Sequence, residues 1–289
     1  MAIQLGRLGG WFQLTMLELA ELEAFFEDNW QHCLFMHGNL LNHGLGLKPH
    51  PDSTDFWGLR QGEDLVAVIG CTRSGHLMAH TTQELDTKPL GAMLAGRRIS
   101  KAIGAADVIS PMLRRLIGGV VERAQVKCEP LMMCDLDTLV APAGPDIRLR
   151  RAELADRPLL QFWCEGYCAD TSMRIAPATM VQHILATGVT SIALHEDEPA
   201  AMIGLSGRSE DMVQLADIYV PPHKRKLGVA TATVATFLKE QRAQGMKRAL
   251  LSSSGPEATR CYFRVGFEEI ADYTHINGFR PFVVGAAPC

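Results

Sequence analysis

The sequence predicts an α/β (α+β) protein with a mixed, mostly antiparallel central sheet flanked by helices, built as two similar domains in tandem. The chain has 289 residues, about twice the length of a typical domain. The run from Ala141 to Asp146 contains two prolines and a glycine, which interrupts any periodic pattern. On both sides of this run, an extended piece is followed by a helical pattern and then by several strands. We therefore expect domains at 1–140 and 147–289 and a linker at 141–146.

The composition is that of an ordinary globular protein. Hydrophobic residues make up 47% and charged residues 21%, which argues against disorder of the whole chain. The formal net charge is -4 and the pI about 6.2, so the basic surplus of a nucleic-acid-binding protein is missing. No segment approaches the roughly 20 apolar residues that span a bilayer. An acidic amphipathic pattern near the N-terminus does not resemble a signal peptide, so we expect a cytoplasmic protein.

A metal site is not predicted. The eight cysteines are scattered, and only Cys164 and Cys168 share a helix face. No second pair of ligands follows them at the spacing of a zinc site, and the ten histidines contain no HExxH pattern.

Hydrophobic periodicity and turn residues place the elements of each half. In the first half we expect a helix over 17–26, strands over 56–60, 65–71 and 76–80, and a helix that begins at Pro111 behind a Ser110 cap. In the second half we expect strands over 147–151, 190–195, 200–207, 212–220 and 248–253, and helices over 154–167, 179–186, 228–244 and 257–265. The second half thus has the order β-α-α-β-β-β-α-β-α.

The segment from Val220 to Thr231 carries the strongest chemical signal. A strand ends there, a proline-containing turn follows, and a basic loop of small residues opens a helix. The first turn of a helix has backbone N–H groups without intrahelical partners and a partial positive charge. Gly228 and Ala230 would let an anion approach these N–H groups, and Arg225 and Lys226 add charge. The segment predicts a site for a phosphate-bearing ligand, although the Walker and dinucleotide-binding patterns are absent.

Two motifs in this half resemble those of the GNAT superfamily of N-acetyltransferases. Val220-x-Pro222-x-x-Arg225-x-x-Gly228-x-Ala230 is similar to the family's Gln/Arg-x-x-Gly-x-Gly/Ala motif at the start of a helix. Ala258-x-x-x-Tyr262-x-x-x-Gly266-Phe267 follows at the family's distance. The resemblance extends over roughly 147–273 and includes the order of elements.

The resemblance implies an acyltransferase that uses acetyl-CoA as co-substrate and no metal. The pantetheine arm would pair with the strand at 218–220, which splays from the strand at 250–252, and the pyrophosphate would lie on the N–H groups of 226–231. Tyr262 would act as the general acid that protonates the leaving sulfur after direct attack by an amine. The implied cofactor-binding residues are Ile218, Tyr219, Val220, Arg225, Lys226, Leu227, Gly228, Val229, Ala230 and Thr231.

The sequence departs from the family's pattern at one position, and it does not identify a general base. The family's Asn before the last helix falls at Gly255, so Ser253 or Ser254 would have to supply that contact. Asp217 and Glu165 are candidate bases, but both could be surface carboxylates.

The first half is similar to a degenerate copy of the same domain. Lys101 to Ala106 nearly matches the phosphate-loop pattern, but the next helix is expected to begin only at Pro111. We therefore expect no CoA site in this half.

The sequence thus predicts transfer of an acetyl group to a primary amine of a small-molecule or peptide acceptor, with neither nucleic acid nor membrane as partner. The acceptor, the acyl-chain preference and the oligomeric state are open. Two alternatives remain: a catalytically inactive acyl-CoA sensor, and an aminoacyl transferase of tandem GNAT architecture that uses charged tRNA.

Overall fold

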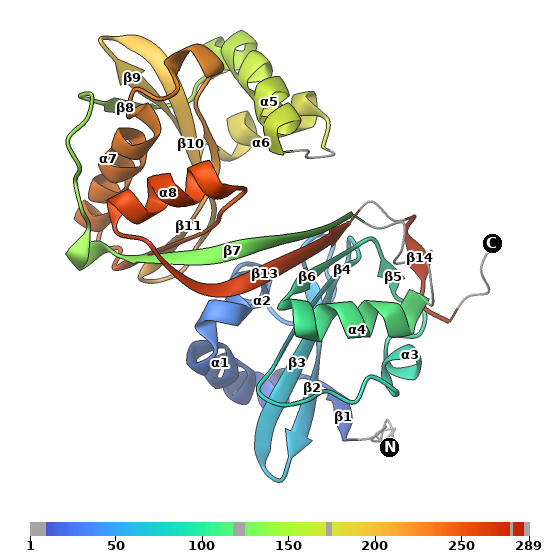
Figure 1. The fold of residues 1–289 in the computed structure, drawn as a ribbon. Coiled ribbons are helices and arrows are strands. Elements are labelled where there is room, and N and C mark those ends of the chain that lie inside the picture. Colours follow the sequence, from blue (N-terminus) through green and yellow to red (C-terminus); the bar gives the residue numbers. More distant parts are fainter. Residues whose placement is uncertain (1–9, 118–124, 172–174, 278–279, 286–289) are drawn as a thin grey trace. The chain divides into compact units, whose positions relative to one another are not determined.

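The computed structural model describes residues 10–117, 125–171, 175–277 and 280–285 (Figure 1). The chain forms two compact units. The first comprises Met1–Glu129 together with Ala271–Cys289, and the second comprises Pro130–Ile270. No helix in the described part of the chain is long and apolar enough to cross a membrane.

The first unit is a mixed sheet with helices. Its strands follow the spatial order β1 (Trp11–Gln13), β2 (Thr54–Gln61), β3 (Asp64–Thr72), β4 (His76–Thr81), β6 (Lys101–Gly104) and the end of β13 (Glu268–Asn277). Its helices are α1 (Leu19–Asp28), α2 (Trp30–His43), α3 (Leu90–Met93) and α4 (Ala106–Ile117). A separate short pair joins β5 (Arg98–Ile99) to β14 (Phe282–Val283). Only β4 and β6 are parallel among the pairs of the larger sheet that lie in the described residues of this unit.

The second unit repeats this plan. Its strands follow the order β8 (Arg148–Arg151), β9 (Thr190–His195), β10 (Glu198–Arg208), β11 (Met212–Tyr219), β12 (Arg248–Ser252) and the end of β7 (Gln125–Asp135). Its helices are α5 (Arg157–Thr171), α6 (Pro177–Thr187), α7 (Val229–Ala243) and α8 (Pro256–Val265). The β11–β12 pair is parallel and its neighbours are antiparallel. The predicted element order of this half is the observed one from β8 to α8, whereas β13 and β14 were not predicted.

Two apolar clusters attach the helices of the second unit to opposite faces of its sheet (Figure 1). On one face, Val234 and Leu238 of α7 and Val265 of α8 pack with strand residues such as Leu251. On the other face, α5 and α6 pack on a different set of strand residues, which includes Tyr219. The sheet thus separates α7 and α8 from α5 and α6.

The sixth strand of each unit comes from the other part of the sequence. In the second unit, Ser252 pairs with Leu131 and Arg248 with Asp135, although β7 follows α4 of the first unit in the chain. In the first unit, Thr274 pairs with Gly104, although β13 follows α8 of the second unit. The units therefore differ from the predicted division at 141–146.

The proline-rich run at 141–146 is largely exposed, but it lies against the second unit. The Val140 N–H donates to the Val265 carbonyl at 3.0 Å, so the chain is already attached to the second unit before the run begins. A Cβ on Gly144 would lie 3.6 Å from Ala232 of α7. Proline and glycine interrupt secondary structure here without marking a boundary between units.

The helix expected at Pro111 begins five residues earlier. Pro111 lies inside α4, and the buried residues Val108, Ile109 and Met112 hold the helix on the core of the first unit. Burial of this face outweighs the cost of an internal proline, on the order of 3 kcal/mol. Gly104 consequently lies just before a helix, contrary to the expectation for that segment. In the first half, α2, α3, β1, β5, β6 and β7 were not predicted from the sequence.

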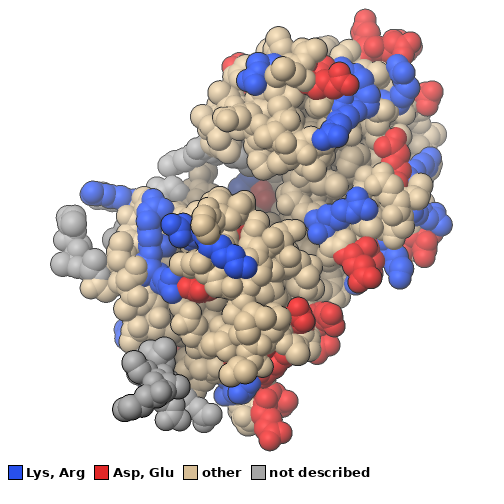
Figure 2. All heavy atoms as spheres, turned by 180° about the vertical axis from the view of Figure 1, so that it is seen from behind, with Lys and Arg blue, Asp and Glu red and all other residues tan. Residues whose placement is uncertain are grey.

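Acidic and basic side chains are interspersed on the face drawn in Figure 2, and much of that face carries neither. This distribution fits the near balance of the composition, with 28 basic and 32 acidic residues.

Candidate functional site

The central feature of the second unit is the place where β11 and β12 part. Their parallel pairing runs from Met212–Arg248 to Gln214–Leu250, and among the described residues no pair between them follows. A bulge in β11 lies beyond this point, since Gly204 pairs with Ala216 and Met202 with Tyr219. Bulges re-aim a strand and end its pairing. The predicted splay of these two strands is thus present in the structure.

The loop at 225–231, which we call the anion loop, leads from this opening into α7. Lys226 has a φ of 63° and Gly228 a φ of 80°, so the backbone turns sharply twice before the helix begins. Gly228 is the N-cap of α7, and its carbonyl accepts the Ala232 N–H at 3.0 Å. The N–H groups of the first helical turn, from Val229 onward, have no partner within the helix. The local geometry is that of an anion site.

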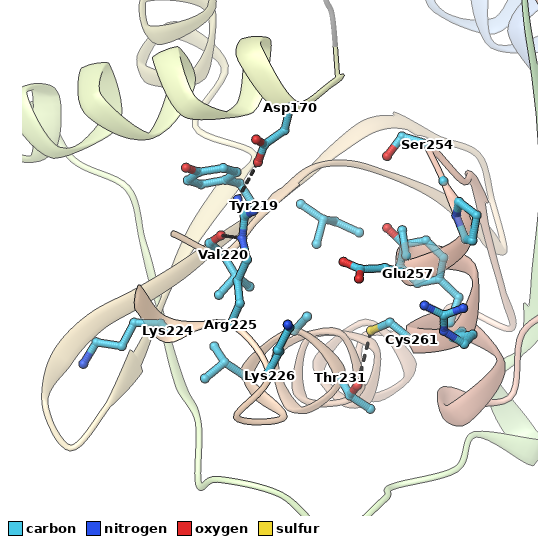
Figure 3. A pocket seen from close by; sticks show the side chains of 18 of the residues that line it. Asp170, Tyr219, Val220, Lys224, Arg225, Lys226, Thr231, Ser254, Glu257 and Cys261 are labelled. Atoms are coloured by element: carbon cyan, nitrogen blue, oxygen red, sulfur yellow. Dashed lines mark hydrogen bonds and ion pairs between the residues drawn. The ribbon is translucent and has the colours of Figure 1, made fainter. Parts of the chain in front are cut away.

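A pocket of about 610 Å³ lies against the anion loop, within the size range of ligand sites (Figure 3). It is enclosed by α5, the end of β11, the anion loop and α8. Nine of the ten residues expected to bind the cofactor line it: Ile218, Tyr219, Val220, Arg225, Lys226, Gly228, Val229, Ala230 and Thr231. Leu227 is absent from the lining, and its side chain is 61% exposed.

The cations around the pocket fall into two groups. Lys224 pairs with Glu198 at 3.3 Å, and Arg225 pairs with Asp170. The pocket-lining residues Lys226, Arg260 and Arg264 form no ion pair within the part of the chain that the structure describes. This second group is available to an anionic ligand.

Tyr262 lies on α8 and lines the same pocket. Its side chain is largely buried, and its ring packs against Phe267 with the ring centres 5.7 Å apart. The neighbouring Cys261 thiol lies 3.3 Å from the Thr231 hydroxyl of α7 (Figure 3). The expected general acid and the anion loop therefore lie on one cavity.

The two candidate bases differ in their surroundings. Glu165 is exposed on α5 and accepts a hydrogen bond from the Gln161 amide at 2.7 Å. Asp217 is half-buried in the bulge of β11, with a φ of 54°. Burial raises the pKa of Asp217, and the nearby His183 opposes this rise. A strained, partly desolvated carboxylate is the stronger functional candidate of the two.

Gly255 is the N-cap of α8 and offers no side-chain amide. The Ser253 hydroxyl is buried and bonded to the Thr259 hydroxyl at 2.8 Å. Ser254 is exposed and lines the pocket, so of the two serines it is the one that can reach a ligand.

Several pocket residues were not found from the sequence. On α8 the residues Glu257, Arg260, Cys261 and Arg264 recur at intervals of three and four, which is the spacing of one helix face. That pattern could have identified them once Tyr262 was placed. The α5 residues Tyr167, Asp170 and Thr171 also share one helix face, but only the fold brings that face to the pocket.

One group of possible metal ligands lies in the first unit. Nitrogen and oxygen atoms of His43, His50 and Asp52 lie within 4.8 Å of one another. However, His50 Nδ1 already accepts the Asp52 N–H at 3.2 Å, and the Lys48 ammonium lies beside the His43 carbonyl. An occupied lone pair and a neighbouring cation both count against binding of a metal ion.

The second half of the chain matches a known protein family. Residues 166–282 match the model of the acetyltransferase (GNAT) domain. This part of the chain is a GNAT acetyltransferase domain. The matched range includes the end of β11, the anion loop and Tyr262.

Solved structures resemble nearly the whole chain. A Drosophila protein from a structural genomics consortium aligns with a TM-score of 0.66 and 13% identity, covering 96% of this chain and 99% of that one. A GNAT family acetyltransferase from Colwellia psychrerythraea aligns with a TM-score of 0.50 and 13% identity, covering 93% and 99%. The GCN5-related glucosamine N-acetyltransferase region of a fungal multi-domain β-N-acetylglucosaminidase aligns with a TM-score of 0.52 and 12% identity, covering 94% of this chain and 38% of that one. At these identities the likeness is one of fold, and it confirms the predicted fold class. No curated protein matches the sequence.

Proposed function

We propose that the second unit transfers the acetyl group of acetyl-CoA to a primary amine of a small-molecule or peptide acceptor. The observation that carries this proposal is the shared cavity: the parted strand β11, the anion loop and Tyr262 all line one pocket. Each of the three serves a different part of the reaction.

The donor substrate fits the residues present. Beyond Gln214, the edge of β11 that faces β12 forms no further strand pair within the described residues, and its backbone groups offer hydrogen bonds to an extended amide chain such as pantetheine. The anion loop offers helix N–H groups, and Lys226, Arg260 and Arg264 offer positive charge for the phosphates. Gly228 keeps the entrance to α7 free of a side chain, because its left-handed backbone favours glycine.

The chemistry requires a proton acceptor and a proton donor. A neutral amine attacks the thioester carbonyl, the carbon–sulfur bond breaks, and the sulfur leaves as a thiolate or thiol. Tyr262 is a hydrogen-bond donor at neutral pH and is our candidate for protonating that sulfur.

Asp217 is our candidate for taking up the amine proton. It belongs to β11, two residues before Tyr219 of the pocket wall, and burial raises the pKa of its carboxyl toward the range useful for a base. Water can carry the proton over the remaining path.

We further propose that the first unit is a degenerate GNAT-like module without a CoA site. In each unit a strand leads to a helix and then to a parallel partner strand. In the second unit that helix is α7, with 15 residues; in the first unit it is α3, with 4 residues. Of the near match to the phosphate-loop pattern, Lys101 to Ala106, residues 101–104 form strand β6 and Ala106 begins α4, and burial lowers the pKa of Lys101. A four-residue helix offers no comparable anion site.

A screen of amine acceptors with acetyl-CoA, with release of the free thiol as the readout, tests the proposed function. Thiol release that depends on an acceptor and falls in Tyr262→Phe supports acetyl transfer. Binding of acetyl-CoA without turnover on any amine would favour the sensor, and binding of charged tRNA without binding of CoA would favour the aminoacyl transferase.

A further inference from the structure

Arg225 is held by three contacts with other residues of the protein (Figure 3). Its Nε donates to the Val220 carbonyl at 2.8 Å, and its terminal nitrogen pairs with Asp170 at the end of α5. The guanidinium carbon lies 5.5 Å from the centre of the Tyr219 ring, in the range of a cation–π contact. A side chain with these three contacts is already oriented before any ligand arrives.

Each contact fixes a different part of the pocket. The bond to Val220 closes the turn between β11 and the anion loop, so it holds the loop from which the free N–H groups project. The contact with Tyr219 holds the end of β11, and the pair with Asp170 ties both to α5. Tyr219 in turn lies so close to α5 that a Cβ on Gly166 would be 2.0 Å from its hydroxyl oxygen.

We propose, on the basis of the function proposed above, that Arg225 is a positioning residue that joins the anion loop to α5 through Asp170, and that it is not a direct ligand of the donor's phosphates. Lys226 and the two arginines of α8 then supply the charge that faces the phosphates. Because the ion pair between Asp170 and Arg225 connects α5 to the anion loop, Asp170 favours donor binding even though its carboxylate repels an anion.

The direction in which Asp170→Asn changes the affinity for acetyl-CoA distinguishes a phosphate ligand from a positioning residue. If Arg225 contacts phosphate, removing a competing carboxylate frees the guanidinium and tightens binding of acetyl-CoA. If Arg225 positions the loop, the same change loosens it and weakens binding about 2- to 5-fold, the value of a partly exposed ion pair. The exposed fractions of the two side chains, 38% for Arg225 and 48% for Asp170, support this modest size.

A second variant tests the geometry rather than the charge. Lysine keeps the positive charge of Arg225 but cannot donate to Val220 and Asp170 at once in a planar fork. Arg225→Lys should therefore weaken acetyl-CoA binding by at least about 5-fold, although it preserves the net charge of the loop. The salt dependence of binding should stay as in the wild type for this variant and decrease in Lys226→Gln.

The experiment is calorimetric titration of the full chain with acetyl-CoA, combined with the steady-state kinetics of the acceptor found in the screen. Glu198→Gln is the matched control, because it removes a carboxylate paired with Lys224 of the adjoining turn, and it should leave the Kd within twofold. Asp170→Asn should raise both the Kd of acetyl-CoA and the KM of the acceptor and leave kcat unchanged, a split that general loss of fold would not produce. Unchanged or tighter binding in Asp170→Asn, or full binding in Arg225→Lys, would overturn the positioning role. Failure of the wild type to bind acetyl-CoA would instead remove the proposed function itself.

Discussion

Gly228→Glu should strongly reduce stabilisation by acetyl-CoA. Gly228 has a φ of 80°, and a Cβ there would lie 3.3 Å from the Pro145 ring. A residue other than glycine in this conformation costs about 1–2 kcal/mol. A carboxylate about 4 Å from a phosphate adds a repulsion of roughly 1 to 4 kcal/mol per charge pair, depending on the solvent exposure.

A conservative loss of about 2 kcal/mol in binding weakens the Kd roughly 30-fold. At a ligand concentration of about 100 times the wild-type Kd, the wild type gains about 2.7 kcal/mol of stability and the variant about 0.9 kcal/mol. A thermal-shift titration measures this difference.

Gly245→Glu is the matched control. Gly245 has a φ of 92° just beyond the other end of α7, and a Cβ there would meet no atom within 4 Å. The control therefore has similar backbone strain and the same added charge, but it lies away from the pocket. It should lower the melting temperature without ligand and keep the full stabilisation by acetyl-CoA. Equal loss of stabilisation in both variants, or in neither, would refute the assignment of the anion loop.

Four further predictions follow from the same geometry. Tyr262→Phe should lower kcat on the order of 100- to 10,000-fold with an unchanged Kd for acetyl-CoA, and an unchanged rate would make Tyr262 a packing residue. Asp217→Asn should lower the rate of acetyl transfer. It should also raise the melting temperature at neutral pH but not near pH 4, because a carboxyl whose pKa is raised by folding destabilises the folded state at pH values above its pKa in the unfolded chain. A shift in melting temperature, relative to the wild type, that is the same at both pH values would contradict this. Burial lowers the pKa of His80 to about 4, so stability should decrease as pH falls from about 6.5 toward 4, and His80→Gln should flatten that decrease in a pH series of denaturant titrations. A fragment of residues 130–270 should fold and bind acetyl-CoA, whereas a fragment of residues 147–289 should aggregate because β12 loses its partner strand β7. A soluble 147–289 fragment that binds acetyl-CoA would show that β7 is not needed.

Local patterns predicted the elements of the second half from β8 to α8. Strands and helices there end at residues whose backbone preference is strong, such as Gly188, which has a left-handed φ of 60° after α6. The anion loop was also found from the sequence, since its chemistry comes from consecutive residues. Physical reasoning on neighbours in the chain is sufficient for such features.

Features that depend on distant residues were not predictable in this way. Nothing local indicates that β7 leaves its own half to pair with β12, because pairing partners depend on the whole fold. The same holds for Asp170, which lies 55 residues from its partner Arg225. The local preference of proline for the first position of a helix predicts a helix start at Pro111, whereas burial of one face of α4 makes the helix begin at Ala106.

Each chain should bind one acetyl-CoA, and the second unit should bind it. Calorimetric titration of the full chain with acetyl-CoA measures this stoichiometry directly. We expect a value near one for the wild type and for Lys101→Glu, which alters the first unit's near match to the phosphate loop. A stoichiometry near two for the wild type that falls to one in Lys101→Glu, or the absence of binding to the wild type, would contradict it.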